Sequence, residues 1–127
     1  MKYLGIDFGS KKVGFAVSDD TGKMAFPHSV ILNSGKLLEE VQKIVDKEKV
    51  EAIVIGESKN FKGEPNKIML AIENFKKELE ERLKIKVWFE PEFMTSQQAK
   101  HIQGETGLHD ASAATIILQS YLDKNNM

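Results

Sequence analysis

An aspartate interrupts the first apolar stretch of the sequence and is the residue best placed to do chemistry. The segment YLGIDFGSKKVGFAVSD, residues 3–19, carries Asp7 just before a glycine and two lysines. Taking an ionised carboxylate out of water costs several kcal/mol or more unless a cation or hydrogen-bond donors meet it. We therefore expect a cationic partner beside Asp7, and Gly5 and Gly9 leave room for a ligand or another backbone to approach.

The composition limits the metal ions that could provide this positive charge. The chain contains no cysteine and three histidines, which excludes disulfides and thiolate zinc sites. Carboxylates and backbone oxygens suit hard cations, so Mg2+ or Mn2+ are the natural candidates. Without a metal, Asp7 would accept hydrogen bonds from the following turn or pair with Lys11 or Lys12.

The charge balance argues against a protein that coats nucleic acid through bulk electrostatics. The net charge is −1, whereas such binding neutralises many phosphates at once. A focused site for nucleic acid is compatible with this charge. Arg82 is the one arginine among 18 basic residues, so lysine side chains would have to contact phosphates in place of the arginine fork.

The elements that would position Asp7 begin with three strands. Apolar and small residues alternate over residues 2–8 and 12–18, which predicts a hairpin. The segment SDDTGK is typical of a turn. A third strand should cover residues 24–32, where Pro27 indicates a sheet edge or a bulge. The sequence thus predicts three sequential antiparallel strands.

Helices and strands alternate in the rest of the chain. We expect a helix capped by Asn33 or Ser34 and ending near residue 48, and a second helix from about Pro65 to Leu83. Short apolar strands should lie at residues 51–57 and 86–90. Thr95 or Ser96 should cap a short helix to about residue 103, and a last helix should cover residues 110–124.

This order predicts an α/β fold with a mixed five-stranded sheet and helices on both faces. At 127 residues the chain suits a single domain, residues 1–127. Its apolar runs are shorter than the roughly 20 residues of a membrane span, and Asp7 comes too early for a signal peptide. We therefore expect a cytoplasmic protein that does not act at a membrane.

Four segments of the sequence carry a family resemblance: GIDFGSKKVGFAVSD at 5–19, IVIGE at 53–57, EPEFMTSQQA at 90–99 and DASAATIILQSYL at 110–122. Together they resemble the YqgF/RuvX family. These RNase H-like proteins are related to Holliday junction resolvases and are usually described as pre-16S rRNA nucleases. The resemblance implies an RNase H-like nuclease domain over almost the whole chain.

The late motif departs from the family pattern. Most relatives read Asp-Glu-Arg, followed two residues on by Thr-Thr or Thr-Ser. Aligning this chain on Thr95 and Ser96 places Pro91, Glu92 and Phe93 at the three earlier positions, so the glutamate alone is kept.

Two glutamates therefore compete for one role in the implied site. The middle strand of relatives commonly ends in Gly-Leu-Pro, whereas here it ends in Gly56 and Glu57, with a carboxylate where resolvases of the wider superfamily carry one. Glu90 and Glu92 flank Pro91, so one should face the site while the other is solvated. The alignment favours Glu92 over Glu90, and Glu57 and Glu92 stay open as alternatives.

The chemistry implied by the resemblance is cleavage of a phosphodiester by two hard cations, which activate water and stabilise the leaving oxygen. Asp7, one glutamate and Asp110 would hold the ions. Asp110 opens the predicted last helix, where a carboxylate also caps the helix and is favoured by its dipole. Capping and metal binding are compatible roles.

Further polar residues beside these carboxylates are candidates for binding substrate phosphates. Each lysine taken alone is better explained as solvent-facing charge. The hydroxyl residues also suit a helix cap, and a helix N-terminus can bind phosphate. The candidates are Ser10, Lys11, Lys12, Lys59, Lys62, Lys67, Thr95 and Ser96.

The leading hypothesis is a metal-dependent endonuclease of structured nucleic acid, which the resemblance narrows to the 5′ end of pre-16S rRNA and to the small-subunit precursor as a partner. A monomer or weak homodimer would suffice. Cleavage of branched DNA by a Holliday junction resolvase is an alternative and would require a stable dimer. Two other classes are a sugar-kinase or actin-like ATPase, for which the chain is too short, and a catalytically silent RNA-binding or ribosome-assembly module.

Overall fold

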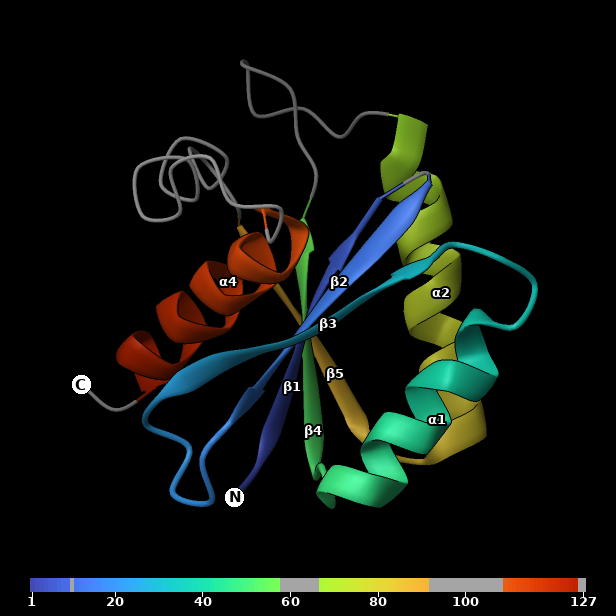
Figure 1. Ribbon diagram of the computed structural model, residues 1–127. Helices are drawn as coiled ribbons and strands as arrows, with labels where there is room; N and C mark the ends of the chain where they lie inside the picture. The colour runs from blue at the N-terminus through green and yellow to red at the C-terminus, as the bar shows by residue number, and fades with distance from the viewer. Residues whose placement is uncertain (10, 58–66, 92–108, 126–127) are drawn as a thin grey trace.

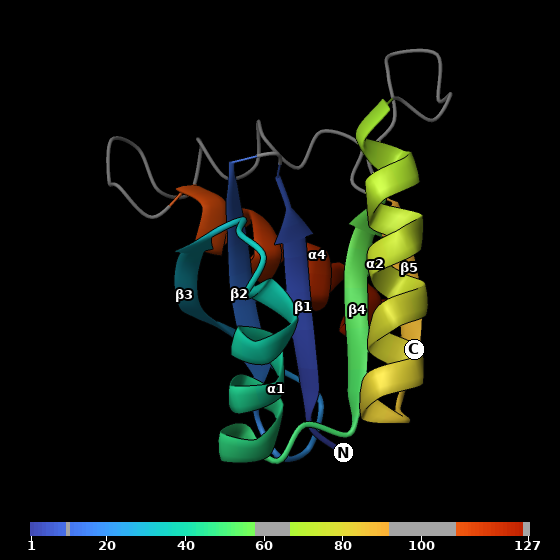
Figure 2. The ribbon, with the colours of Figure 1, turned by 90° about the vertical axis from the view of Figure 1, so that its right-hand side faces the viewer.

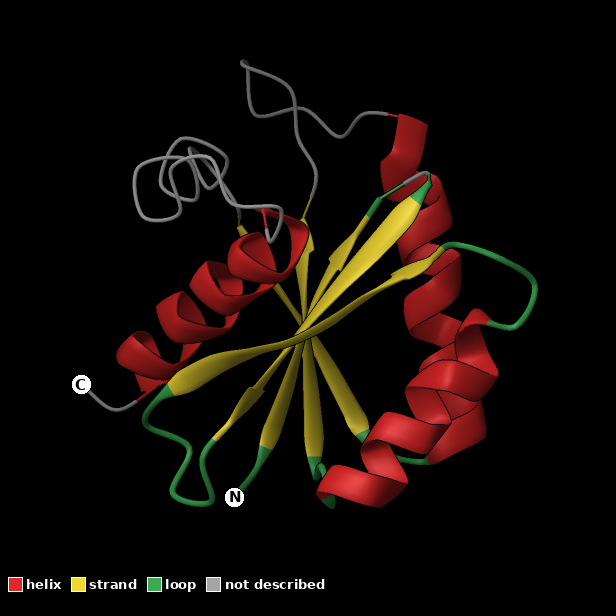
Figure 3. Cartoon of the chain, viewed as in Figure 1, coloured by secondary structure: helices red, strands yellow, loops and turns green. Residues whose placement is uncertain are grey.

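The protein is described by a computed structural model over residues 1–9, 11–57, 67–91 and 109–125. Its strands form one five-stranded sheet in the order β3-β2-β1-β4-β5 (Figures 1 and 3). The elements in chain order are β1 Tyr3–Phe8, β2 Lys12–Ser18, β3 Ala25–Leu32, α1 Leu37–Glu48, β4 Ala52–Glu57, α2 Lys67–Leu83, β5 Lys86–Pro91 and α4 His109–Asn125.

The strand directions confirm the predicted mixed sheet. β1 and β2 form the antiparallel hairpin, and β3 adds to β2 antiparallel at the sheet edge. β4 and β5 run parallel to β1. Pro27 lies on the edge strand and beside a bulge, because the register passes from Phe15–Ser29 to Ala16–Pro27 and leaves His28 as the extra residue. Both roles expected of Pro27 are confirmed.

Helices cover both faces of the sheet, as predicted. α1 and α2 lie on one face and α4 on the other (Figure 2). Side chains alternate along each strand, so Leu4 and Ile6 of β1 join the core beneath α1 and α2, whereas Tyr3 joins the core beneath α4. The α4-facing positions of β1 are thus its odd-numbered residues.

Small residues let α4 approach the sheet closely. The core between α4 and the sheet contains Ala16, Ala52 and Ala114, and Gly5 lies directly beneath the helix. A Cβ atom at Gly5 would lie 2.7 Å from Leu118 Cβ and 3.0 Å from the carbonyl oxygen of Ala114. The absence of a side chain at Gly5 therefore sets how near α4 comes to β1.

The predicted cap of the first helix is wrong. α1 begins at Leu37, with Lys36 at the N-cap and no side-chain capping bond. The Asn33 side chain instead donates from Nδ2 to the carbonyl oxygen of Gly9 at 2.8 Å, and Ser34 Oγ accepts from the Lys36 N–H at 3.3 Å. Asn33 is thus used to bind the β1–β2 turn, and a short turn separates it from the helix.

The remaining helix predictions have mixed outcomes. α2 ends at Leu83 as expected, and α4 begins at His109, one residue before the predicted start. Pro65 and the short helix predicted after Thr95 or Ser96 lie outside the described residues. Among the helices that the structure describes, none combines the length and apolarity needed to cross a membrane.

Replacing Gly5 with alanine should destabilise the protein by about 1–3 kcal/mol, the usual cost of forcing extra atoms into a packed core. The new methyl group would overlap Leu118 Cβ and push α4 from the sheet. Gly35→Ala is the matched control, because a Cβ at Gly35 would meet nothing within 4 Å. Urea unfolding of both variants measures the effect, and equal free energies of unfolding would contradict this account of α4 packing.

Candidate metal and nucleic-acid site

Asp7 lies in β1 near its carboxyl end and is half-buried. It follows Tyr3 and Gly5 on the α4-facing side of the strand by alternation. Its antiparallel partner in β2 is Gly14, and the β1–β4 register, in which Ile6 lies beside Ile55, places Gly56 next to it in β4. The two residues directly across from Asp7 in the neighbouring strands are therefore both glycines, which carry no side chain.

The backbone brings Asp110 to the same end of the same face. Asp110 is the second residue of α4 and lies one turn before Ala114, whose carbonyl oxygen lies over Gly5. One helical turn moves about 6 Å along α4, and two residues from Gly5 to Asp7 move about 7 Å along β1. The first turn of α4 and the last residues of β1 lie at the same end of the sheet (Figures 1 and 2).

The structure describes one of the two glutamates proposed for the third position. Glu57 is the last residue of β4 and is half-buried. Because Ile53 and Ile55 belong to the core beneath α1 and α2, alternation places Glu57 in their row, on the face opposite Asp7, and Gly56 in the α4-facing row. As the last residue of β4, which runs parallel to β1, Glu57 lies at the end of the sheet that carries Asp7. Glu92 lies outside the described residues. Within the described part of the chain, no three histidine or acidic side chains form a metal-binding group.

Glu90 is a buried carboxylate that the sequence analysis expected to be solvated. Its side chain is 3% exposed and accepts hydrogen bonds from Ser120 Oγ at 3.1 Å and from Lys124 Nζ. Glu90 pairs in register with Gly56, so it lies on the α4 face of β5. Its contacts bind the second half of α4 to the sheet edge, and burial, with Tyr3 and Glu90 adding to the effect, raises the pKa of nearby Tyr121.

The β1–β2 turn brings two of the predicted phosphate-binding lysines to the end of the sheet that carries Asp7. Lys11 and Lys12 are both exposed there. Asn33 holds this turn twice, through its Nδ2 bond to Gly9 and through its backbone N–H, which donates to the Lys11 carbonyl oxygen at 2.8 Å. A Cβ atom at Gly9 would overlap the Lys12 carbonyl oxygen, so the turn is tight.

Asn33 is thus a positioning residue that the sequence analysis interpreted as a helix cap. An asparagine directly after a strand suits both roles, because its side chain bonds readily to nearby backbone. The remaining phosphate-binding candidates are not placed. Lys67 opens α2, but its side chain is not described, and five predicted residues lie outside the described part of the chain: Ser10, Lys59, Lys62, Thr95 and Ser96.

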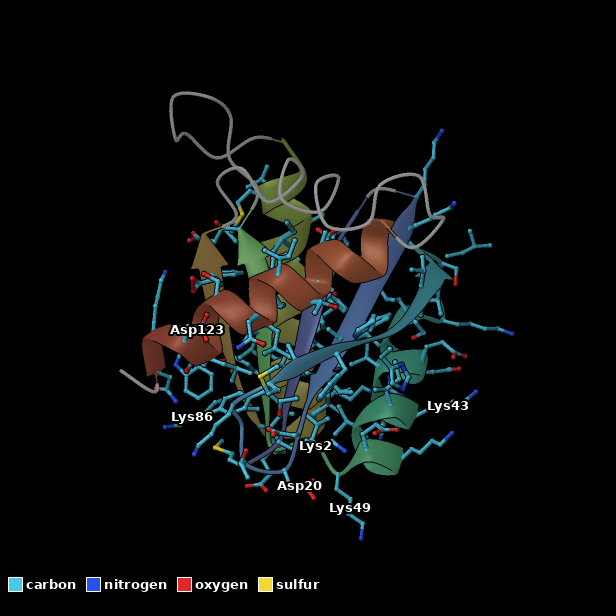
Figure 4. All side chains as sticks on the ribbon, turned by 60° about the vertical axis from the view of Figure 1, so that its left-hand side comes forward. Lys2, Asp20, Lys43, Lys49, Lys86 and Asp123 are labelled. Carbon is cyan, nitrogen blue, oxygen red and sulfur yellow. The ribbon has the colours of Figure 1, made fainter. Side chains whose placement is uncertain are left out.

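The opposite end of the sheet carries charges of both signs. Lys2, Asp20 and Lys49 lie there, around the start of β1 (Figure 4). The Lys2 ammonium donates to Glu48 Oε1 at 3.2 Å, and this bond holds the pKa of Glu48 below its ordinary value. Among the residues that the structure describes, no helix starts at this end beside a strand-end carboxylate.

The residue types at the Asp7 end suit a hard divalent cation. Oxygen ligands from carboxylates are the set that Mg2+ and Mn2+ prefer. The glycines beside Asp7 leave space for an ion and a phosphate, and the first turn of α4 favours a carboxylate at Asp110. Asp7 therefore fits the role of a metal ligand, whereas Asp110 is placed at this end by its backbone alone, because its side chain is not described.

The family model described as "RuvX: Holliday junction resolvase" matches residues 1–124. The chain belongs to the RuvX family. A Clostridium botulinum member (strain Eklund 17B) is 40% identical over 98% of each chain, and one from Nitratidesulfovibrio vulgaris is 34% identical over 97% of this chain and 94% of its own. Both are named "Putative pre-16S rRNA nuclease".

The fold of this RuvX-family chain is also that of RuvC, an RNase H-like resolvase. The structure of Thermus thermophilus RuvC in complex with a Holliday junction substrate superposes with a TM-score of 0.67. It shares 15% sequence identity and covers 99% of this chain and 96% of RuvC. The predicted RNase H-like sheet is confirmed by this likeness.

Asn33→Ala should destabilise the protein by about 1 kcal/mol, because the Gly9 carbonyl loses its side-chain hydrogen bond. Amide hydrogen exchange should also rise in the β1–β2 turn. Asn74→Ala is the control, since no hydrogen bond holds the Asn74 side chain within the described part of the chain. Unchanged exchange around Gly9 in Asn33→Ala would show that Asn33 does not position the turn.

Proposed function

We propose that this chain is a metal-dependent endonuclease that processes the 5′ end of pre-16S rRNA during ribosome assembly in the cytoplasm. The observation that carries the proposal is the position of Asp7, half-buried at the end of β1, flanked by Gly14 and Gly56 and on the face that α4 covers. The names of the RuvX-family relatives support the rRNA substrate.

Asp7 and Asp110 would hold Mg2+ or Mn2+ together with one glutamate, either Glu57 or Glu92. When bound, such ions supply an activated water and stabilise the leaving oxygen in phosphodiester cleavage. The protein's own contribution is to bring carboxylates from separate chain segments to one end of the sheet and to place glycines directly across from Asp7 in β2 and β4. The small-subunit precursor would be the partner, and a monomer or weak homodimer would be enough.

The candidate lysines and hydroxyl residues would orient the substrate. Lys11 and Lys12 project from a turn that Asn33 and Gly9 hold in place, so their ammonium groups would meet phosphates flanking the scissile bond. We assign the same role to Ser10, Lys59, Lys62, Thr95 and Ser96. Because arginine is almost absent, these contacts would act through point charges and would weaken as the salt concentration rises.

Resolution of branched DNA is a second candidate, favoured by the description of the matching family model as a Holliday junction resolvase. A resolvase cuts two symmetry-related strands and needs a stable dimer. Mass in solution, together with competition between four-way DNA and a 16S precursor fragment, separates the two candidates. A stable dimer that prefers four-way DNA would replace the rRNA proposal.

Purified protein should cleave a 16S precursor fragment in the presence of Mg2+ or Mn2+, and the cleavage should stop in excess EDTA. Asp7→Asn should lower the cleavage rate by about 10³-fold or more, because metal binding supplies several kcal/mol of transition-state stabilisation. Asp20→Asn, at the opposite end of the sheet, is the matched control and should cleave normally.

Thermal melts of the same variants give a second readout. Without metal, Asp7→Asn should be at least as stable as wild type, because converging carboxylates repel one another. Mn2+ should stabilise wild type by about 2.7 kcal/mol at a hundredfold excess over Kd and the variant much less. Undiminished cleavage in EDTA would refute metal dependence, and no cleavage by wild type with either ion would favour a silent RNA-binding module.

A further inference from the structure

A cleft of about 330 Å³ opens between α1, α2 and the end of β1, on the face opposite α4. Its walls include Phe8 from β1, Asn33 from the β3–α1 connection, and Asn74, Phe75 and Glu78 from α2. It lies at the end of the sheet that carries the candidate site, because Phe8 directly follows Asp7. We refer to it as the α1–α2 cleft.

Two features connect the cleft with the candidate site: neighbouring residues of β1 and a hydrogen bond to the β1–β2 turn. Phe8 and Asp7 are consecutive in β1 and project to opposite faces of the sheet. Asn33 lines the cleft and also holds the Gly9 carbonyl of the turn that carries the predicted phosphate-binding residues. A polynucleotide whose phosphates follow this turn would therefore pass the mouth of the cleft.

The walls of the cleft combine aromatic rings with side chains that can hydrogen-bond to the polar edge of a nucleobase. Phe8 is half-buried and presents its ring to the cleft, and aromatic side chains stack with bases of every kind. Phe75 is 6% exposed and supports this ring from the core, with the two ring centroids 5.1 Å apart at an interplanar angle of 43°. The Asn33 and Asn74 amides can donate and accept. Within the described part of the chain, no hydrogen bond or ion pair holds the side chains of Asn74 and Glu78.

The negative charge of the cleft favours the binding of a base over the binding of a phosphate. Glu78 is its one charged wall residue among those described, and a carboxylate repels phosphate but accepts hydrogen bonds from the amino group of a base. Uracil lacks an amino group, whereas cytosine carries one at N4. The chemistry of the walls therefore fits a base with an exocyclic amine and disfavours the nucleic-acid backbone.

We propose that the α1–α2 cleft binds one unpaired, amino-bearing nucleobase of the substrate next to the scissile phosphate. The base stacks against the ring of Phe8 and donates from its amino group to Glu78. A base inside a duplex cannot enter the cleft, so this site selects substrates that are single-stranded beside the cut. The inference rests on the proposed function for the nature of the substrate, but base binding can be measured without cleavage.

The test compares two single-stranded RNA hexamers, oligocytidine and oligouridine, by fluorescence anisotropy with the full chain in EDTA. Both carry the same phosphates, so lysine contacts cancel in the ratio of their affinities. Wild type should bind oligocytidine about tenfold more tightly, as expected for one charge-assisted hydrogen bond. In Glu78→Gln, whose side-chain amide can donate to uracil O4 or accept from cytosine, the ratio should fall to near one.

Glu73→Gln is the matched control, because Glu73 is an exposed glutamate of the same helix and lies outside the cleft. Its affinity ratio should equal that of wild type. Equal affinities for the two hexamers in wild type, or an unchanged ratio in Glu78→Gln, would overturn the inference. Metal-dependent cleavage without this selectivity would refute the cleft alone, whereas selectivity without cleavage would refute the nuclease and leave the cleft standing.

Discussion

The close contact between α4 and β1 at Gly5 is the constraint on which the arrangement of the candidate site depends. A glycine at this position lets the Ala114 backbone and the Leu118 side chain lie directly over the central strand. The strand and the helix are held at this separation by a core of alanines and larger apolar residues. The start of α4 then comes to lie at the end of the sheet where β1 delivers Asp7.

The same end of the sheet has different chemistry on its two faces. On the α4 side, a carboxylate lies among glycines, which suits a cation and a phosphate. On the other side, Phe8 and α2 provide an aromatic and amide-lined cleft. Since alternation along a strand separates these two environments by a single residue, β1 can present a phosphate-directed group and a base-directed group to one polynucleotide.

Much of the fold was predictable because its local signals agree with one another. The alternation of apolar and small residues predicts the β1–β2 hairpin. Pro27 cannot donate a ladder hydrogen bond, and it therefore predicts that β3 is an edge strand or carries a bulge; β3 is both. The N-terminus of α1 was mispredicted, since Asn33 bonds to Gly9, a residue 24 positions earlier, rather than to the helix. Such a contact depends on the tertiary placement of β1 and β2, which a local capping pattern does not encode.

The candidate site shows the same limit of local sequence reasoning. Asp7 and Asp110 were found as a charge in an apolar strand and as a carboxylate at a helix start. The glycines beside Asp7 become visible only through the pairing of β1 with β2 and β4. Glu90 was expected to be solvated because it flanks Pro91, whereas Ser120 and Lys124 of a distant helix enclose it.

The most direct test of the central claim, that Asp7 and Asp110 form a metal site, is anomalous diffraction from crystals soaked in Mn2+. We expect a manganese peak bound by both aspartates and by either Glu57 or Glu92, which would also identify the third ligand. Crystals of Asp7→Asn should lack this peak. A wild-type map at saturating Mn2+ with no peak between Asp7 and Asp110, or with manganese bound elsewhere alone, would contradict the account.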